Sequence, residues 1–299
     1  MAEAEIQYAG VKTLQNHEDL KEKTSRFMRS TRFNLSGPAA RKMVDIQVSE
    51  VERWLELLYI AAEGASLRRE DRRKAIEVAA MLGEIRRAVQ RFSARSPLTL
   101  VDAAAGKSYL GLLAAKLVFE PLRRPCSVVT LERDPGRAAL SRRAAEHLHS
   151  TVPIECRQAD VASPEAWPPS PSIVAALHAC GAAADAVIDR AIASRARMLL
   201  LVPCCTSRAV AAVRRAREEA GRLGIPRHAP VRRRFIQAIV DAERTWRLEA
   251  AGYETEVVEF VGATVTPHNL LWRSRLVAEP ARMAAAARIH TEKFRGKAR

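Results

Sequence analysis

The chain has 299 residues, of which 48% are hydrophobic, so it is long and apolar enough to bury a full core, and an intrinsically disordered protein is excluded. Its 49 lysines and arginines outnumber 34 aspartates and glutamates, giving a formal net charge of +15 at pH 7. A surface of this sign favours polyanions, and an arginine-rich surface that is merely solvated is the alternative.

Targeting signals and metal-binding motifs are missing from the sequence. No apolar segment follows a basic start, and no run approaches the roughly 20 apolar residues that span a bilayer. We therefore expect a cytoplasmic protein with no membrane partner. The five cysteines, at positions 126, 156, 180, 204 and 205, form no C-x-x-C pair and no spacing typical of zinc sites. This pattern predicts reduced thiols and no bound metal.

The first part of the chain, residues 1–95, contains almost nothing that is typical of a strand. Two stretches, 48–65 and 69–92, place apolar residues at helical spacing with charges between them. We therefore predict a helical N-terminal region over 1–95. The segment "KTSRFMRSTRF" within it alternates Arg26, Arg29 and Arg32 with phenylalanines.

Residues 96–278 alternate short apolar runs with amphipathic helices, which predicts one α/β domain followed by a basic tail over 279–299. The runs cover 98–102, 126–132, 153–158, 172–178, 197–203, 255–262 and 270–278. Most of the first five are largely apolar, as parallel strands covered on both faces are, and the last two are close enough for an antiparallel pair. We predict a doubly wound, seven-stranded, mostly parallel sheet. A helix at 207–223 and the basic segment 226–235 form an insertion after the fifth strand.

The loop after the first run is the strongest candidate for a ligand site, because doubly wound sheets bind ligands beyond the carboxyl ends of their strands. The run ends in Asp102, and "AAAG" follows. A pyrophosphate needs the G-x-G-x-x-G fingerprint, and this loop has one glycine, so a dinucleotide fits poorly. A tight turn of small residues bordered by an acid suits S-adenosylmethionine, which carries no phosphate.

Two further acids follow the next strands in register. Glu132 ends the second strand, where a carboxylate accepts hydrogen bonds from both ribose hydroxyls, and Asp160 follows the third, where it would receive the adenine amino group. Each acid alone is also an ordinary residue of a strand-end turn. The three acids together favour a cofactor site.

The chain resembles the class I, Rossmann-like methyltransferases over about residues 96–278. Within that class it is similar to a subgroup with a D-x-x-x-G-K-x-Y-L motif, an H-x-C-G-x-x-x-D segment and a P-C-C segment; here these are "DAAAGKSYL", "HACGAAAD" and "PCC", with "TPHNLLWRSR" at the last strand. That subgroup includes the methyltransferase-like 25 proteins and is related to the tRNA acceptor-stem 2′-O-methyltransferase. The zinc-binding modules of the tRNA enzyme are missing, so its tRNA specificity does not carry over.

The resemblance implies a set of functional residues. Those implied to bind S-adenosylmethionine are Asp102, Ala104, Gly106, Lys107, Tyr109, Glu132, Asp160 and His178, and those implied to border the methyl acceptor are Pro203 and Asn269. Ala104 and Ser108 stand where many members of the wider class carry glycine, a departure that narrows the loop.

Catalysis has several candidates. The "D/N-P-P-Y" arrangement that holds an exocyclic amine is absent, which disfavours adenine amino methylation. His178 is a candidate general base or a simple strand cap, and Asp185 either orients it or is a first-turn helix acid. Cys180, Cys204 and Cys205 allow a thiolate mechanism of cytosine C5 methylation as a minor alternative, although they are more typical of pocket and core residues.

The acceptor is predicted to be RNA. Arginines interleaved with aromatics grip phosphates and stack on unpaired bases, which makes Arg26, Arg29 and Arg32 candidate RNA contacts. The same phenylalanines can instead pack on the domain while the arginines face water. Two hypotheses stay open: an active methyltransferase acting on RNA, a small molecule or a protein side chain, and a non-catalytic fold that binds RNA or a protein.

Overall fold

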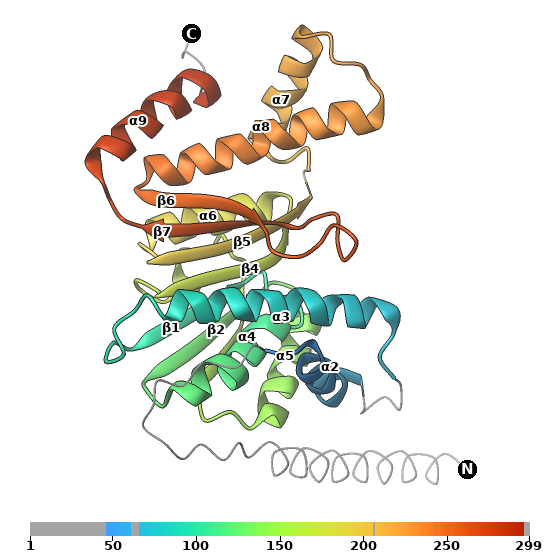
Figure 1. Ribbon diagram of the computed structural model, residues 1–299, viewed down its shortest axis with the longest axis vertical. Coiled ribbons are helices and arrows are strands. Elements are labelled where there is room, and N and C mark those ends of the chain that lie inside the picture. The colour runs from blue at the N-terminus through green and yellow to red at the C-terminus, as the bar shows by residue number, and fades with distance from the viewer. Residues whose placement is uncertain (1–45, 61–65, 206, 296–299) are drawn as a thin grey trace.

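The computed structural model describes residues 46–60, 66–205 and 207–295 (Figure 1). Its centre is a seven-stranded sheet with the order β3-β2-β1-β4-β5-β7-β6. The strands are β1 (Leu98–Ala103), β2 (Cys126–Glu132), β3 (Ile154–Gln158), β4 (Ile173–Cys180), β5 (Met198–Cys205), β6 (Tyr253–Glu259) and β7 (Leu270–Leu276). The first five are parallel, and β7 runs antiparallel to both β5 and β6. The predicted seven-stranded, mostly parallel sheet is confirmed.

Helices cover both faces of this sheet. They are α2 (Val48–Leu55), α3 (Arg69–Val89), α4 (Tyr109–Leu113), α5 (Pro135–Leu148), α6 (Ala182–Ala193), α7 (Ala211–Arg222), α8 (Ala229–Ala250) and α9 (Pro280–His290). Alternate residues of β1 divide between two apolar cores: Leu98 and Leu100 pack with α3, α4 and α5, whereas Val101 and Ala103 pack with α6 and α8. This alternation follows from the two-residue period of a strand and explains the apolar character of the central runs.

The described part of the N-terminal region packs directly on the sheet. Trp54 of α2 and Val78, Met81 and Ile85 of α3 are buried in the same core as Leu100 of β1. Figure 1 shows α3 running across the middle of the sheet. The predicted helices are therefore part of the core of the α/β domain. Arg26, Arg29 and Arg32 lie outside the described residues.

The insertion after β5 is a helical hairpin of α7 and α8. Most of the basic segment 226–235, which was predicted as part of an insertion, forms the first turns of α8, and this helix continues unbroken from Ala229 to Ala250. Pro230 lies in the first turn, where a missing backbone N–H costs no intrahelical hydrogen bond. The segment predicted as a basic tail over 279–299 begins with the alanine-rich helix α9, which folds against α8.

Hydrogen bonds hold α9 in place. The guanidinium of Arg282 donates to both carboxylate oxygens of Glu249 on α8, and His290 Nε2 lies 3.1 Å from Glu243 Oε1. Both glutamates are buried. Among the described residues, no helix is long and apolar enough to cross a membrane.

Candidate functional site

The site is built at the carboxyl ends of β1, β2, β4 and β5, together with the β6–β7 loop. Strands β1 and β4 are neighbours, but the helices that follow them, α4 and α6, pack in the cores on opposite faces. The chain therefore reverses direction between β1 and β4, and this reversal is the position at which open α/β sheets bind ligands. A cleft of about 560 Å³ lined by Leu98, Arg124 and Pro153 lies at the opposite ends of the strands and is not part of this site.

The loop after β1 is held by Asp102. This aspartate is buried, and its Oδ2 accepts the Gly111 N–H of α4 at 2.8 Å. A Cβ on Gly111 would approach Asp102 Cβ and Thr130 Cγ2 to 2.9 Å, so only glycine lets α4 approach the two strands this closely. Sequence analysis did not single out Gly111, although its position in "KSYLG" was visible.

Three residues of this loop have left-handed backbone conformations. Ala104 has φ 55°, Gly106 has φ 61° and Ser108 has φ 59°. Such a φ costs a non-glycine residue on the order of 1–2 kcal/mol, whereas glycine adopts it freely. Ala104 and Ser108, which stand where many members of the wider class carry glycine, thus have strained backbone conformations. Ser108 gains a compensating contact, since its hydroxyl lies 3.0 Å from the hydroxyl of Ser141 on α5.

Glu132 closes the loop from the neighbouring strand. Its Oε2 accepts the Gly106 N–H at 2.8 Å, and its Oε1 accepts the Asp134 N–H at 2.9 Å. Each carboxylate oxygen keeps a second acceptor position that the ribose hydroxyls of a cofactor could use. A Cβ on Gly106 would meet nothing within 4 Å, so the loop borders open space beside this carboxylate.

The helical N-terminal region also contacts the loop, through a residue that sequence analysis missed. Tyr59, in the π-helical turn η1 (Glu56–Ile60), donates its hydroxyl to the Lys107 carbonyl at 2.7 Å. Its ring meets that of Tyr109 edge-on, with centroids 4.5 Å apart. The side chain of Lys107 is exposed. No pattern in the sequence pairs two segments so far apart, but a tyrosine at the end of a predicted amphipathic helix was a visible candidate.

Asp160 lies beyond the end of β3, as predicted. It is exposed, its Oδ1 accepts the Ala162 N–H at 2.9 Å, and Arg133 lies 4.0 Å from its Oδ2. This is the geometry of an Asx turn. The carboxylate therefore has a local structural role and an exposed face at the same edge as Glu132.

His178 lies at an irregularity near the end of β4. The register between β4 and β5 shifts at this residue, and His178 has φ 63°. Its Nε2 lies 2.9 Å from Glu77 Oε1 on α3, and Glu77 Oε2 accepts Lys74 Nζ at 2.9 Å. Burial raises the pKa of Glu77, but the hydrogen bonds from His178 and Lys74 outweigh it, and the net shift is downward. The carboxylate is therefore ionised at neutral pH and accepts only, so in the neutral form of His178 the proton lies on Nε2 and Nδ1 carries the lone pair.

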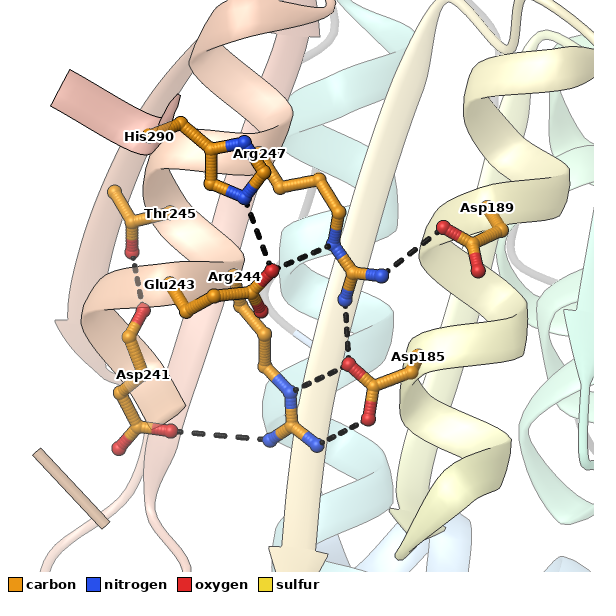
Figure 2. A network of polar contacts seen from close by, with 8 residues as sticks. All are labelled: Asp185, Asp189, Asp241, Glu243, Arg244, Thr245, Arg247 and His290. Carbon is orange, nitrogen blue, oxygen red and sulfur yellow. Dashed lines mark hydrogen bonds and ion pairs between the residues drawn. The ribbon is translucent and has the colours of Figure 1, made fainter. Parts of the chain in front are cut away.

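Of the two roles considered for Asp185, the structure shows an acid in the first turn of α6 that is bonded to α8 and not to His178. Asp185 Oδ2 accepts Arg244 Nη2 at 3.0 Å, and its Oδ1 accepts Arg247 Nη2, as Figure 2 shows. Both arginines are on α8, and Arg244 is fully buried. Asp185 thus joins α6 to α8, and the acid that orients His178 is Glu77. An acid in the first turn of α6 points toward α8, away from the strand end, because α6 packs on that face.

Further charges complete the network between α6, α8 and α9. Asp189 pairs with Arg247 at 3.0 Å, Asp241 lies 3.8 Å from Arg244, and Glu243 lies between Arg247 and His290 (Figure 2). A buried arginine such as Arg244 is stable only with such partners. The network is a structural junction that fixes α8 on the sheet.

The prediction of reduced thiols is wrong for Cys180 and Cys204, which form a disulfide with Cα atoms 5.4 Å apart. The two adjacent strands end side by side, a proximity that sequence spacing does not reveal. A disulfide sulfur is not a thiolate, so this arrangement does not support covalent catalysis by either cysteine. Cys205 is the last residue of β5 and pairs in register with Cys180. Cys126 and Cys156 are free.

The two residues implied to border the methyl acceptor reach the same edge. Pro203 is buried and pairs in register with Ala179, next to His178. Asn269 is buried in the β6–β7 loop, where its Nδ2 donates to the Val261 carbonyl at 3.0 Å. Burial, followed by the charge of the neighbouring His178, lowers the pKa of His268 in this loop. The loop therefore brings a second imidazole close to His178.

Replacing Asp102 with asparagine should change how stability depends on pH. Burial raises the pKa of Asp102 to about 7, the Gly111 N–H lowers it in part, and Glu132 raises it again. The folded state therefore binds a proton that the unfolded state has released, and the free energy of unfolding falls as pH rises from about 4 to 7, then levels. Between pH 5 and pH 8 the variant should gain about 3 kcal/mol relative to the parent. Urea denaturation of both proteins at the two pH values measures this, and parallel pH curves would contradict it.

Comparison with known proteins finds a methyltransferase family model that matches part of the chain. Residues 73–211 match the family model Methyltransf_32, described as a methyltransferase domain. No curated protein matches significantly.

The fold is similar to several solved structures. SAH-bound PaMTH1 of Podospora anserina has 13% identity and a TM-score of 0.45, over 85% of this chain and 95% of that one. SAH-bound magnesium protoporphyrin IX methyltransferase of Synechocystis has 14% identity and a TM-score of 0.39, over 84% of this chain and 94% of that one. SAH-bound tRNA (uracil-54, C5)-methyltransferase of Pyrococcus abyssi has 12% identity and a TM-score of 0.38, over 67% of this chain and 38% of that one.

The chemistry of the site suits S-adenosylmethionine. Asp102 and Glu132 place two carboxylates at neighbouring strand ends, which suits a sulfonium cation and ribose hydroxyls. Within the described ranges, no group of three or more metal-ligating side chains is present. Residues 73–211 therefore match a methyltransferase domain, and the chemistry of the two strand ends suits S-adenosylmethionine.

Proposed function

We propose that this methyltransferase acts on RNA and methylates an oxygen or nitrogen atom, with His178 as the general base. The contact between Glu77 and His178 carries the proposal, because it orients an imidazole, through its Nε2, at the edge of the sheet where the cofactor loop lies. A hydroxyl or amine that accepts a methyl group must lose a proton, and an unprotonated Nδ1 is suited to take it.

The residues divide into three roles. S-adenosylmethionine, when bound, supplies an electrophilic methyl group on its sulfonium. Asp102, Gly106 and Glu132, with the neighbouring Ala104, Lys107 and Tyr109, form the loop that would hold this cofactor. His178 would accept the proton of the methyl acceptor, and Glu77 keeps the Nε2 proton in place through the 2.9 Å contact.

The neighbouring segments support a shared acceptor pocket. "HACG" after β4 and "PCC" at the end of β5 are paired in register, through Ala179 with Pro203 and Cys180 with Cys205. This adjacency supports kinship with the subgroup in which the two motifs occur together. We propose that Pro203 and Asn269 border the acceptor and that residues 96–278, with the helices packed on them, form the methyltransferase domain.

RNA is favoured as the acceptor by charge. The excess of 15 positive charges is large for a chain of this length, and RNA is a polyanion that such a surface attracts. A small molecule or a protein side chain is the other acceptor class, and the experiment below separates the two.

Transfer of tritium from [methyl-³H]S-adenosylmethionine should label RNA. The full chain is incubated with bulk cellular RNA, cellular protein and a small-molecule extract, and the label in each fraction is counted before and after ribonuclease treatment. We expect ribonuclease-sensitive label that a His178→Ala variant lowers by about 10²- to 10⁴-fold. Label that enters only the protein or small-molecule fraction would overturn the choice of RNA.

A further inference from the structure

The helical hairpin formed by α7 and the start of α8, residues 207–236, concentrates the positive charge of the chain. It contains nine arginines and two glutamates, so it carries about half of the net charge in a small part of the sequence. The exposed arginines are Arg208, Arg214, Arg215, Arg217, Arg222, Arg227, Arg233 and Arg234. We call this surface the arginine hairpin.

The arginines of the hairpin form few ion pairs, unlike several arginines on the sheet and on α9. On the sheet and on α9, Arg273, Arg275 and Arg282 each form ion pairs with glutamates. In the hairpin, Arg222 pairs with Glu219, and Arg232 donates to the carbonyls of Ile225 and Arg217. The other guanidinium groups of the hairpin form no ion pair within the part of the chain that the structure describes.

The hairpin is a separately packed unit. Val210, Val213, Ala216, Ile236 and Val240 form an apolar core of their own, distinct from the two cores of the sheet. Leu223 and Val231 near the tip are 52% and 50% exposed. The hairpin therefore presents its arginines on two helices that its own core holds in place. Binding a ligand there costs less conformational entropy than binding it with arginines on a loop.

The base of the hairpin lies beside the candidate active site. It follows the carboxyl end of β5 directly, and Ser207 at its start lies against Gly181, three residues after His178, where an added Cβ would come within 3.1 Å. Arg233 is close enough to His268 to contribute to lowering the pKa of that imidazole. Figure 1 shows the hairpin projecting beyond the end of the sheet where the parallel strands finish. A ligand bound along the hairpin would thus lead toward His178.

We propose that the arginine hairpin binds the phosphate backbone of the RNA substrate and guides it to His178, an inference that rests on the proposed function. Guanidinium groups bind phosphates through paired N–H donors, and unpaired arginines along two helices match a ligand whose charges repeat along a chain. An acidic protein would offer carboxylates at irregular positions, a poorer match for guanidinium groups arrayed along two helices.

The test is the salt dependence of RNA binding by the full chain. Binding of a fluorescein-labelled 20-nucleotide RNA of mixed sequence is followed by fluorescence anisotropy from 50 to 200 mM KCl. In this range of ionic strength, contacts to the RNA phosphate backbone dominate the salt dependence of the affinity. For the variant Arg214→Gln/Arg215→Gln we expect binding to weaken by about fivefold or more. The slope of log affinity against log salt should fall by about 1.4, or about 0.7 for each lost phosphate contact.

The matched control is Arg142→Gln/Arg143→Gln, an adjacent exposed pair on α5 that removes the same charge. It should leave both affinity and slope close to those of the parent. Equal losses in the two variants, no loss in the hairpin variant, or tighter binding of poly-L-glutamate than of RNA would overturn the proposal. DNA of the same sequence, run in parallel, shows whether the surface reads the phosphate chain alone.

Two further measurements separate this proposal from the proposed function. Circular dichroism and calorimetric titration with S-adenosylhomocysteine should show that the hairpin variant folds and binds cofactor like the parent. RNA binding through the hairpin without methyl transfer to RNA would leave the binding surface standing and remove the proposed function. RNA methylation that is unchanged in the hairpin variant would leave the proposed function standing and remove the binding surface.

Discussion

Replacing Glu77 with glutamine should lower the rate of methyl transfer by on the order of 10²-fold or more, with little change in cofactor affinity. The carboxylate lies 2.9 Å from His178 Nε2 and fixes the proton there. An amide both donates and accepts, so it no longer selects the tautomer whose Nδ1 is free to take a proton. Loss of the orienting acid in comparable catalytic pairs has effects of this size or larger. The measurement is the initial rate of tritium transfer at saturating S-adenosylmethionine.

Glu84→Gln is a matched control on the same helix. Glu84 is as buried as Glu77, and it accepts two hydrogen bonds from Arg273 at 2.7 and 2.8 Å. Its replacement removes an equivalent buried carboxylate and should lower stability without changing the tautomer of His178. Nitrogen-15 chemical shifts of the His178 imidazole report its tautomer directly. We expect the Nε2–H tautomer in the parent and in the Glu84→Gln variant, and a mixture of the two tautomers in the Glu77→Gln variant. Equal rate losses in the two variants would assign Glu77 a structural role only.

Replacing Glu132 with alanine should weaken S-adenosylhomocysteine binding by about 10²-fold or more. Two hydrogen bonds from ribose hydroxyls to a carboxylate are each worth about 1.5–3 kcal/mol, and the same substitution frees the Gly106 N–H that now orders the loop. Calorimetric titration measures the affinity. The 2′-deoxy form of the ligand separates the two causes: the parent should bind it more weakly than the ribose form, and the variant should bind both alike.

Asp134→Ala is the control for this change. Asp134 is two residues away, and its Oδ1 caps α5 by accepting the Arg137 N–H at 2.8 Å. Its loss should cost about 1 kcal/mol of stability and leave ligand affinity intact. If the Glu132→Ala variant bound as tightly as the parent, the assignment of the cofactor site to these strand ends would be wrong.

Local patterns in the sequence determined the fold. The run 126–132 coincides with β2, and the other six predicted strands overlap the observed ones with small shifts at their ends. These predictions succeeded because the period of apolar residues and the positions of turn residues are set by neighbours in the chain. The same patterns placed Asp102 and Glu132 at adjacent strand ends, where the structure has them. The unusual backbone of Ala104 and Ser108 was visible only as a departure from glycine.

Tertiary structure decided the chemistry around His178. The partner of this imidazole is Glu77 on a helix far earlier in the chain, and the nearby Asp185 is bonded instead to Arg244. Likewise, only the pairing of β4 with β5 brings Cys180 and Cys204 together. Charges and thiols take the partner that packing brings within about 4 Å, and a linear sequence does not encode which helix face meets which strand end. The sequence alone therefore determined the sheet and its strand ends, whereas packing across the sheet chose the acid that contacts His178.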